Sequence, residues 1–308
     1  MNRNKFEFNK IFRLFLILAV LLPFGCKKTE INETPNTNTV LLAKLQEFNE
    51  SYSTNNIRQD NLKSTKGFWS AIGDALVVSG ADLIGAAAGA VAVKEVAAIA
   101  GLATGGTGAL VVIGAGAIIA GGGASVAAFR ELKSANMSNG MSKVYSGNLN
   151  IIYPDKYKDL ANCGYNHNKE VFSILNGDSS YSYLKSVTLN NDDQTIFESS
   201  EWQSIIEEIN NSVNGYRVSK NSGELIESLA NKSLITKETS LILNIFFEIY
   251  NQIGQSKHVE DIINFYIESI STAQCLSEED KVSLICSFSV ASESLFLWLN
   301  QYSDEAAN

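Results

Sequence analysis

Apolar residues recur at helical spacing along most of the chain. After residue 153 they fall three and four positions apart in successive segments, separated by short polar connections. The pattern predicts helices over 166–175, 200–214, 222–233, 236–255 and 257–272, and a last helix after Ser277. Ser222 and Ser277 are expected to cap the helices that begin at these serines. Short connections between helices of this length are typical of a bundle, so the sequence predicts an all-α fold.

Residues 66–130 form the least polar part of the chain. Fourteen of the 22 glycines lie between Gly67 and Gly123, and no Asp, Glu, Lys or Arg occurs from Val96 to Phe129. This uncharged run exceeds the ~18 apolar residues that indicate a membrane-spanning helix. A glycine-rich turn at 105–108 predicts a hairpin, with one helix over about 68–104 and a second over about 109–129.

Small residues recur at every fourth position of the predicted hairpin. They are Ala81, Gly85, Gly89, Ala97, Gly101, Gly105, Gly116 and Ala120. This spacing places them on one face of a helix, where the absence of large side chains lets a second helix approach closely. In water each glycine costs about 1 kcal/mol of helix stability relative to alanine, so the hairpin must be packed against something. Two alternatives stay open, namely insertion or assembly in a bilayer and burial as the core of the following domain.

The N-terminus has the order of a signal peptide. Basic residues precede an uncharged run over 14–25, in which the small Gly25 comes directly before Cys26. The run is shorter than the ~20 residues that a spanning helix needs. We therefore expect residues 1–25 to be removed and Cys26 to carry a lipid, followed by a polar tether over 26–65 that contains one short helix. Ordinary secretion, with Cys26 as a plain thiol, is the alternative.

An acidic domain follows the hairpin. Residues 131–308 hold 24 acidic and 12 basic residues, within a chain of 308 residues whose formal charge is -9. We divide this part into a linker over 131–153, an all-α domain over 154–302 and a tail over 303–308. Its acidic charge repels phosphate backbones, so we expect no nucleic-acid partner. The expected partners are a lipid bilayer, a second copy of the chain or another envelope protein.

Residue types that carry catalysis are sparse. Only two histidines occur, and the common serine-hydrolase and zinc motifs are absent. The best candidate site combines a thiol, an imidazole and an amide at Cys163, His167 and Asn168. Gly164 disfavours a helix that would bring the thiol and the imidazole together, so we favour a helix-start motif instead. The sequence thus predicts no enzyme activity, no metal and no cofactor.

Three cysteines remain after Cys26, and they allow at most one disulfide. Three pairings are open among Cys163, Cys275 and Cys286, as is the alternative of three unpaired thiols. A bond between Cys275 and Cys286 requires the former to lie on a loop, because eleven residues of continuous helix span ~16 Å.

Several motifs resemble one group of secreted lipoproteins of Bacteroidota type. They are the Gly-Tyr-Asn-His-Asn run at 164–168, the Gln-Cys-Leu-Ser-Glu-Glu run at 274–279 before the last helix, and Gly67-Phe68-Trp69 leading into the Gly/Ala stretch. In that group the Gly/Ala stretch lies at the C-terminal end, whereas here it precedes the His-Asn motif. The resemblance implies a secreted, lipid-anchored protein and supplies no activity.

The leading functional hypothesis is an envelope lipoprotein whose hairpin associates with membranes or with itself. The outer membrane is its expected location, with the leaflet and the face left open. The alternative is a lipid-tethered binding module in which the Gly/Ala hairpin is internal core.

Overall fold

The computed structural model describes residues 37–57, 66–99, 107–132, 149–179, 182–187, 191–219, 221–253 and 256–306. Every regular element within these ranges is a helix, so the predicted all-α fold is confirmed. The predicted signal peptide, Cys26, Gly101 and Gly105 lie outside the described residues.

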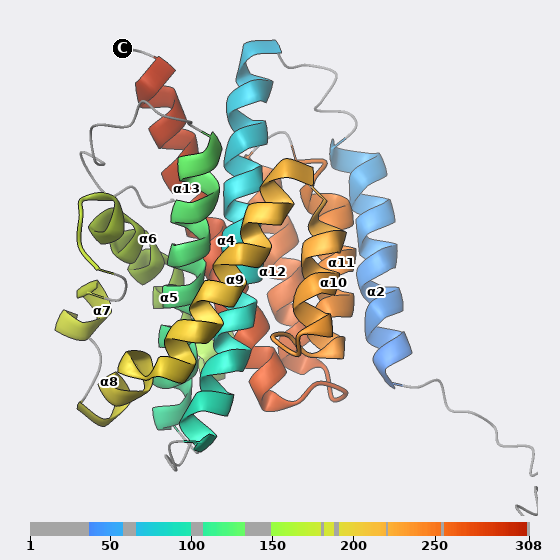
Figure 1. Cartoon of the computed structure of the whole chain (residues 1–308). Coiled ribbons are helices and arrows are strands. Elements are labelled where there is room, and N and C mark those ends of the chain that lie inside the picture. The colour runs from blue at the N-terminus through green and yellow to red at the C-terminus, as the bar shows by residue number, and fades with distance from the viewer. Residues whose placement is uncertain are drawn as a thin grey trace, which may run out of the picture. The chain divides into compact units, whose positions relative to one another are not determined.

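Two short helices and eleven α-helices follow one another in the described chain (Figure 1). Their bounds are α2 Thr37–Tyr52, η1 Ser53–Ile57, α4 Lys66–Ile99, α5 Thr107–Leu132, η2 Asp155–Ala161, α6 Asn162–Leu175, α7 Ser182–Val187, α8 Asn191–Glu198, α9 Ser200–Ser219, α10 Ser222–Asn231, α11 Lys237–Tyr250, α12 Ser256–Thr272 and α13 Glu278–Ala306.

Some boundaries differ from the predicted ones for identifiable local reasons. Ser222 is not the cap of α10, because the side chain of Asn221 accepts hydrogen bonds from the backbone of Gly223 and Glu224. Ser277 does cap α13, since its Oγ accepts the amide of Asp280 at 3.0 Å. The sequence did not predict α7, α8 and η2, because segments of six to eight residues carry too few apolar positions to show a helical period.

The helices α4 and α5 form an antiparallel hairpin held by small residues. A Cβ added to Gly85 would lie 2.7 Å from Cβ of Ala124, and one added to Gly116 would lie 2.7 Å from a methyl group of Val93. Real Cβ atoms do not approach other atoms so closely, so these positions require glycine for the two backbones to meet. Gly89 and Ala120 face each other in the same interface.

The hairpin lies at the centre of the bundle. In Figure 1, α4 and α5 run through the middle of the molecule, with α13, α6 and α9 packed around them. One hydrophobic core joins these helices to α10, α11 and α12. Within the described part of the chain, three helices are long and apolar enough to cross a membrane, at Ala75–Ala98, Leu110–Arg130 and Glu278–Gln301. The protein itself buries 83%, 78% and 83% of these windows, respectively.

The helix within the predicted tether packs on the rest of the domain. The ring of Phe48 stacks on Phe265 with centroids 3.8 Å apart. The buried Asn49 side chain donates to the carbonyl of Ile245 at 2.7 Å and accepts the hydroxyl of Tyr266 at 3.0 Å. These contacts fix α2 against α11 and α12.

A disulfide links α6 to α13. It joins Cys163 to Cys286, with Cα atoms 5.8 Å apart, while Cys275 is unpaired and partly exposed. The structure thereby selects one of the three pairings that the sequence left open.

Candidate functional site

A cluster of polar side chains lies inside the bundle where α4, α5, α6 and α13 meet. Asp82 and His167 are completely buried. Oδ2 of Asp82 accepts hydrogen bonds from Oγ of Ser125 at 2.8 Å, from Oγ of Ser294, and from Nε1 of Trp298 at 3.3 Å. The same indole N–H lies 3.1 Å from Oγ of Ser125. The carboxyl group therefore joins both helices of the hairpin to α13.

Burial makes the two titratable groups of this cluster neutral over a wide pH range. It raises the pKa of Asp82 to about 8, against the opposing hydrogen bonds of the cluster. It lowers the pKa of His167 to about 4, against hydrogen bonds to Asn168 and to the backbone of Gly121. Nδ1 of His167 donates to Oδ1 of Asn168 at 3.1 Å, and its Nε2 lies 3.7 Å from Oδ2 of Asp82.

Cys163 and His167, which the sequence suggested as a candidate catalytic pair, lie in the packed contacts between helices. Cys163 and His167 lie four residues apart on α6, but the sulfur of Cys163 is bonded to Cys286 and the imidazole is completely buried. A thiolate, which is the nucleophilic form of cysteine, does not exist while this disulfide is intact.

The Gly-Tyr-Asn-His-Asn run docks α6 on α13. The amide of Gly164 donates to Oγ of Ser289 at 3.0 Å, and a Cβ at this glycine would lie 2.7 Å from Cγ of Glu293. Nδ2 of Asn168 donates to the carbonyl of Glu293 at 3.1 Å. Gly164 lies inside α6 and does not interrupt the helix, contrary to the prediction. Glycine is required at this position because α13 comes too close for any side chain.

Glycines also cover the outer faces of the hairpin. A Cβ added at these positions would touch a side chain of a neighbouring helix. The neighbours are Phe247 for Gly80 (3.0 Å), His167 for Gly121 (3.2 Å), Glu170 for Gly122 (3.3 Å) and Asn210 for Gly123 (3.1 Å). Small residues therefore also let α6, α9 and α11 pack closely on the hairpin, although less closely than α4 and α5 pack on each other.

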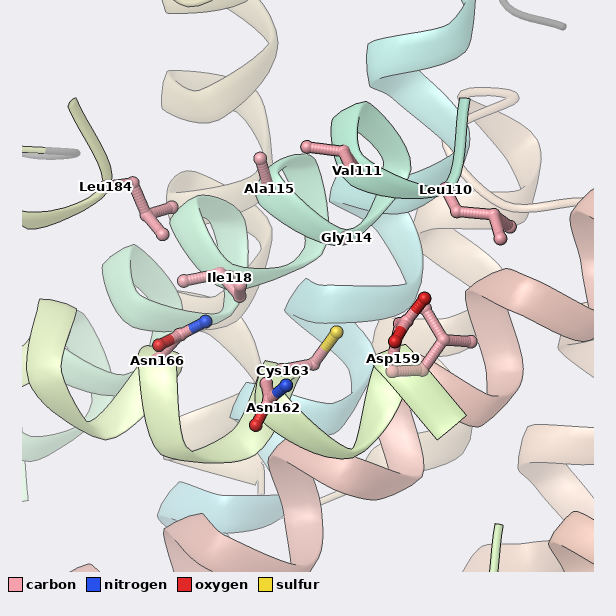
Figure 2. A pocket seen from close by; sticks show the side chains of 11 residues that line it. Leu110, Val111, Gly114, Ala115, Ile118, Asp159, Asn162, Cys163, Asn166 and Leu184 are labelled. Atoms are coloured by element: carbon pink, nitrogen blue, oxygen red, sulfur yellow. The ribbon is translucent and has the colours of Figure 1, made fainter. Parts of the chain in front are cut away.

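Gly114 differs from these glycines because it borders a cavity. A Cβ there would meet only Sγ of Cys163, at an ordinary 3.5 Å. The cavity has a volume of about 310 Å³ and lies between α5 and α6, with Leu184 of α7 at its border (Figure 2). Figure 2 shows Ala115 and Ile118 of α5 on one side and Asn162 of α6 on the other.

Sequence reasoning missed the polar cluster and the cavity. Neither Asp82 nor Ser125 nor Ser294 belongs to a motif that the sequence marks as a site. The available signal was a lone carboxylate among apolar helix positions, because a buried charge requires a hydrogen-bonded partner elsewhere in the fold. The identity of that partner is not encoded locally, since Trp298 lies 216 residues further along the chain.

No family model matches the chain, and neither a curated protein nor a solved structure matches it. Among the described residues, no group of three or more His, Cys, Asp and Glu side chains is placed to hold a metal ion. Function is therefore inferred from the geometry of the chain itself.

Proposed function

We propose that this protein is an envelope lipoprotein that acts as a tethered binding module. In this proposal the Gly/Ala hairpin is the core of the module, and the cavity beside α5 is its binding site. The observation that carries the proposal is that the same chain buries 83% of the apolar window of α4 and 78% of that of α5.

The polar contacts of α4 support this role. Asp82 bonds to Ser294 and Trp298 of α13, which lie outside the hairpin. Oγ of Ser79 lies 2.6 Å from the hydroxyl of Tyr250 on α11. Further along α4, Oγ of Ser283 donates to the carbonyl of Ala87 at 3.2 Å. A hairpin that moved into a bilayer would lose each of these partners, and an unpartnered buried polar group costs about 1–3 kcal/mol.

A lipid on Cys26 would supply the membrane attachment. Only ten residues separate Cys26 from the start of α2, and α2 is fixed on α11 and α12. The folded module would then be held close to the membrane surface, and the hairpin would not be needed as an anchor.

Membrane insertion of the hairpin is the second candidate function. It is favoured by the length and composition of the three apolar helices. The contacts between Gly85, Gly89, Gly116 and Ala120 lie within the hairpin and would persist in lipid. Ser125 belongs to the hairpin as well and would keep its hydrogen bond to Asp82.

Liposome flotation of the mature protein with Cys26→Ser separates the two functions. We expect this protein to stay in the aqueous fraction, because the hairpin is covered. Flotation that disappears when residues 67–130 are deleted would overturn the proposal and support insertion. A Cys26 protein processed in a bacterial envelope is the positive control and should float.

A further inference from the structure

The cavity between α5 and α6 opens at the surface of the bundle, where Val111, Asp159 and Asn162 are exposed. At about 310 Å³ this cavity has room for about ten groups of the size of a water or a methylene, taking about 30 Å³ for each, which matches a decanoyl chain and leaves a head group at the open border. The space exists because Gly114 and Ala115 present almost no side chain to it. Larger apolar residues such as Leu or Val are also compatible with an α-helix at these two positions.

The two sides of the cavity differ in chemistry. The side formed by α5 is apolar and includes Val111 and Ile118. The opposite side adds polar groups, the amides of Asn162 and Asn166 and the carboxylate of Asp159 (Figure 2). A ligand that matches both sides has an apolar body and several hydroxyl groups along or at the end of it.

The charge of the polar side restricts the ligand further. Asp159 lies at the exposed border of the cavity, and no Lys or Arg is among the described residues that line it. A carboxylate or phosphate head group would be repelled there, whereas hydroxyl groups can donate to the carboxylate and exchange hydrogen bonds with the amides.

We propose that this cavity binds one molecule of a single-chain amphiphile with an uncharged polyhydroxyl head, of the monoacylglycerol class. The acyl chain lies along Gly114 and Ile118, and the head group lies against Asn162 and Asn166. This assignment rests on the proposed binding function and names its ligand class.

The test uses the mature Cys26→Ser protein without vesicles and 1-decanoylglycerol below its critical micelle concentration. Isothermal titration calorimetry should show one site per chain, and decanoate should bind more weakly than the glyceride. Because Sγ of Cys163 borders the cavity, bound ligand should slow the reduction of the Cys163–Cys286 disulfide by a phosphine. Absence of binding, or binding of many molecules per chain, would overturn the assignment.

Substitutions at Gly114 locate the site. Gly114→Leu fills the space of about three methylene groups and should weaken binding about fiftyfold, at about 0.8 kcal/mol for each group. Gly114→Ala is accommodated at the ordinary contact distance and should weaken binding only about fourfold, with less effect on the octanoyl glyceride. Gly73→Leu is the matched control, because Gly73 has no neighbour within 4 Å. Equal affinity of Gly114→Leu, Gly114→Ala and the unsubstituted protein would contradict the proposal.

The two proposals fail in different experiments. A protein that does not float and does not bind the glyceride refutes the cavity assignment alone. A protein that floats through its hairpin, but binds one glyceride in a manner sensitive to Gly114, refutes the core role of the hairpin and retains the site.

Discussion

Nε2 of His167 lies 3.7 Å from Oδ2 of Asp82, with both side chains completely buried. Burial favours the neutral form of each group, so the pKa of the acid is raised and the pKa of the base is lowered. A histidine and an aspartate this close would form an ion pair at a surface. Here they meet as two neutral groups that connect α6 to the hairpin.

The stability of the protein should fall as the pH rises from 6.5 to 8. The pKa of Asp82 is raised from 3.8 in the unfolded chain to about 8 in the fold, so its stabilising effect is complete below pH 3.8 and is lost as the pH rises from 3.8 to about 8, where the unfolded chain has released the proton and the fold still holds it. The pKa of His167 is lowered from 6.5 to about 4, so its stabilising effect is lost as the pH falls through that interval. The two effects oppose each other between about pH 4 and 6.5. Above pH 6.5 only Asp82 changes the free energy of unfolding, which falls by about 2 kcal/mol between pH 6.5 and pH 8.

The variant Asp82→Asn isolates this dependence. It keeps an acceptor for Ser125 and Trp298 but has no proton to lose. Urea denaturation followed by circular dichroism at pH 6.5 and pH 8 should show the decline for the unsubstituted protein and a flat response for the variant. The same slope in both proteins would place the pH dependence elsewhere.

Gly85→Leu should destabilise the hairpin by about 3 kcal/mol, since its Cβ already collides with Ala124. Thermal denaturation should show a midpoint lowered by about 10 °C. Gly73→Leu lies in the same helix, gains the same helix propensity and meets no neighbour, so its midpoint should not fall. Similar midpoints for both variants would mean that the small residues are not needed for packing.

Loss of the disulfide should lower the free energy of unfolding by about 5 kcal/mol, because its ends are 123 residues apart in the chain. The variant Cys286→Ala tests this, and Cys275→Ala is the control because Cys275 is unpaired. In the Cys26→Ser protein, thiol titration after denaturation should find one thiol before reduction and three after it. Three thiols before reduction would refute the bond.

Gly164→Ala should loosen the contact of α6 with α13. Its Cβ would lie 2.7 Å from Cγ of Glu293 and still closer to the backbone oxygen of Ser289, which cannot rotate away. We expect a loss of about 2 kcal/mol in chemical denaturation, whereas Gly73→Ala should gain about 1 kcal/mol from helix propensity. A gain in both variants would show that α13 tolerates a side chain at Gly164.

The helical content and the hairpin could be predicted from the sequence because both are local. A period of 3.6 residues and a glycine-rich turn signal depend on neighbouring positions only, although α5 begins at Thr107, within the predicted turn. The cover over the hairpin could not be predicted, because an apolar helix has the same composition in a bilayer and in a protein core. What distinguishes the two is the set of partners of Gly80, Gly122 and Gly123, and those partners lie on helices that follow later in the chain.

The candidate site was predictable only where a local run of residues marks it. The run at 164–168 was singled out for its residue types, and the structure uses three of them, Gly164, His167 and Asn168, in the contact between helices. The cavity beside Gly114 gave no signal, since an unfilled space is a relationship between two helices and has no motif of its own.

The order of synthesis opposes the order of packing in this chain. The hairpin is made early, but its buried carboxyl is completed by Ser294 and Trp298, near the end of α13. Until those residues have been made, the most apolar segments lack their cover, and exposed apolar surface promotes aggregation. Chains that end before α13 should therefore aggregate instead of folding.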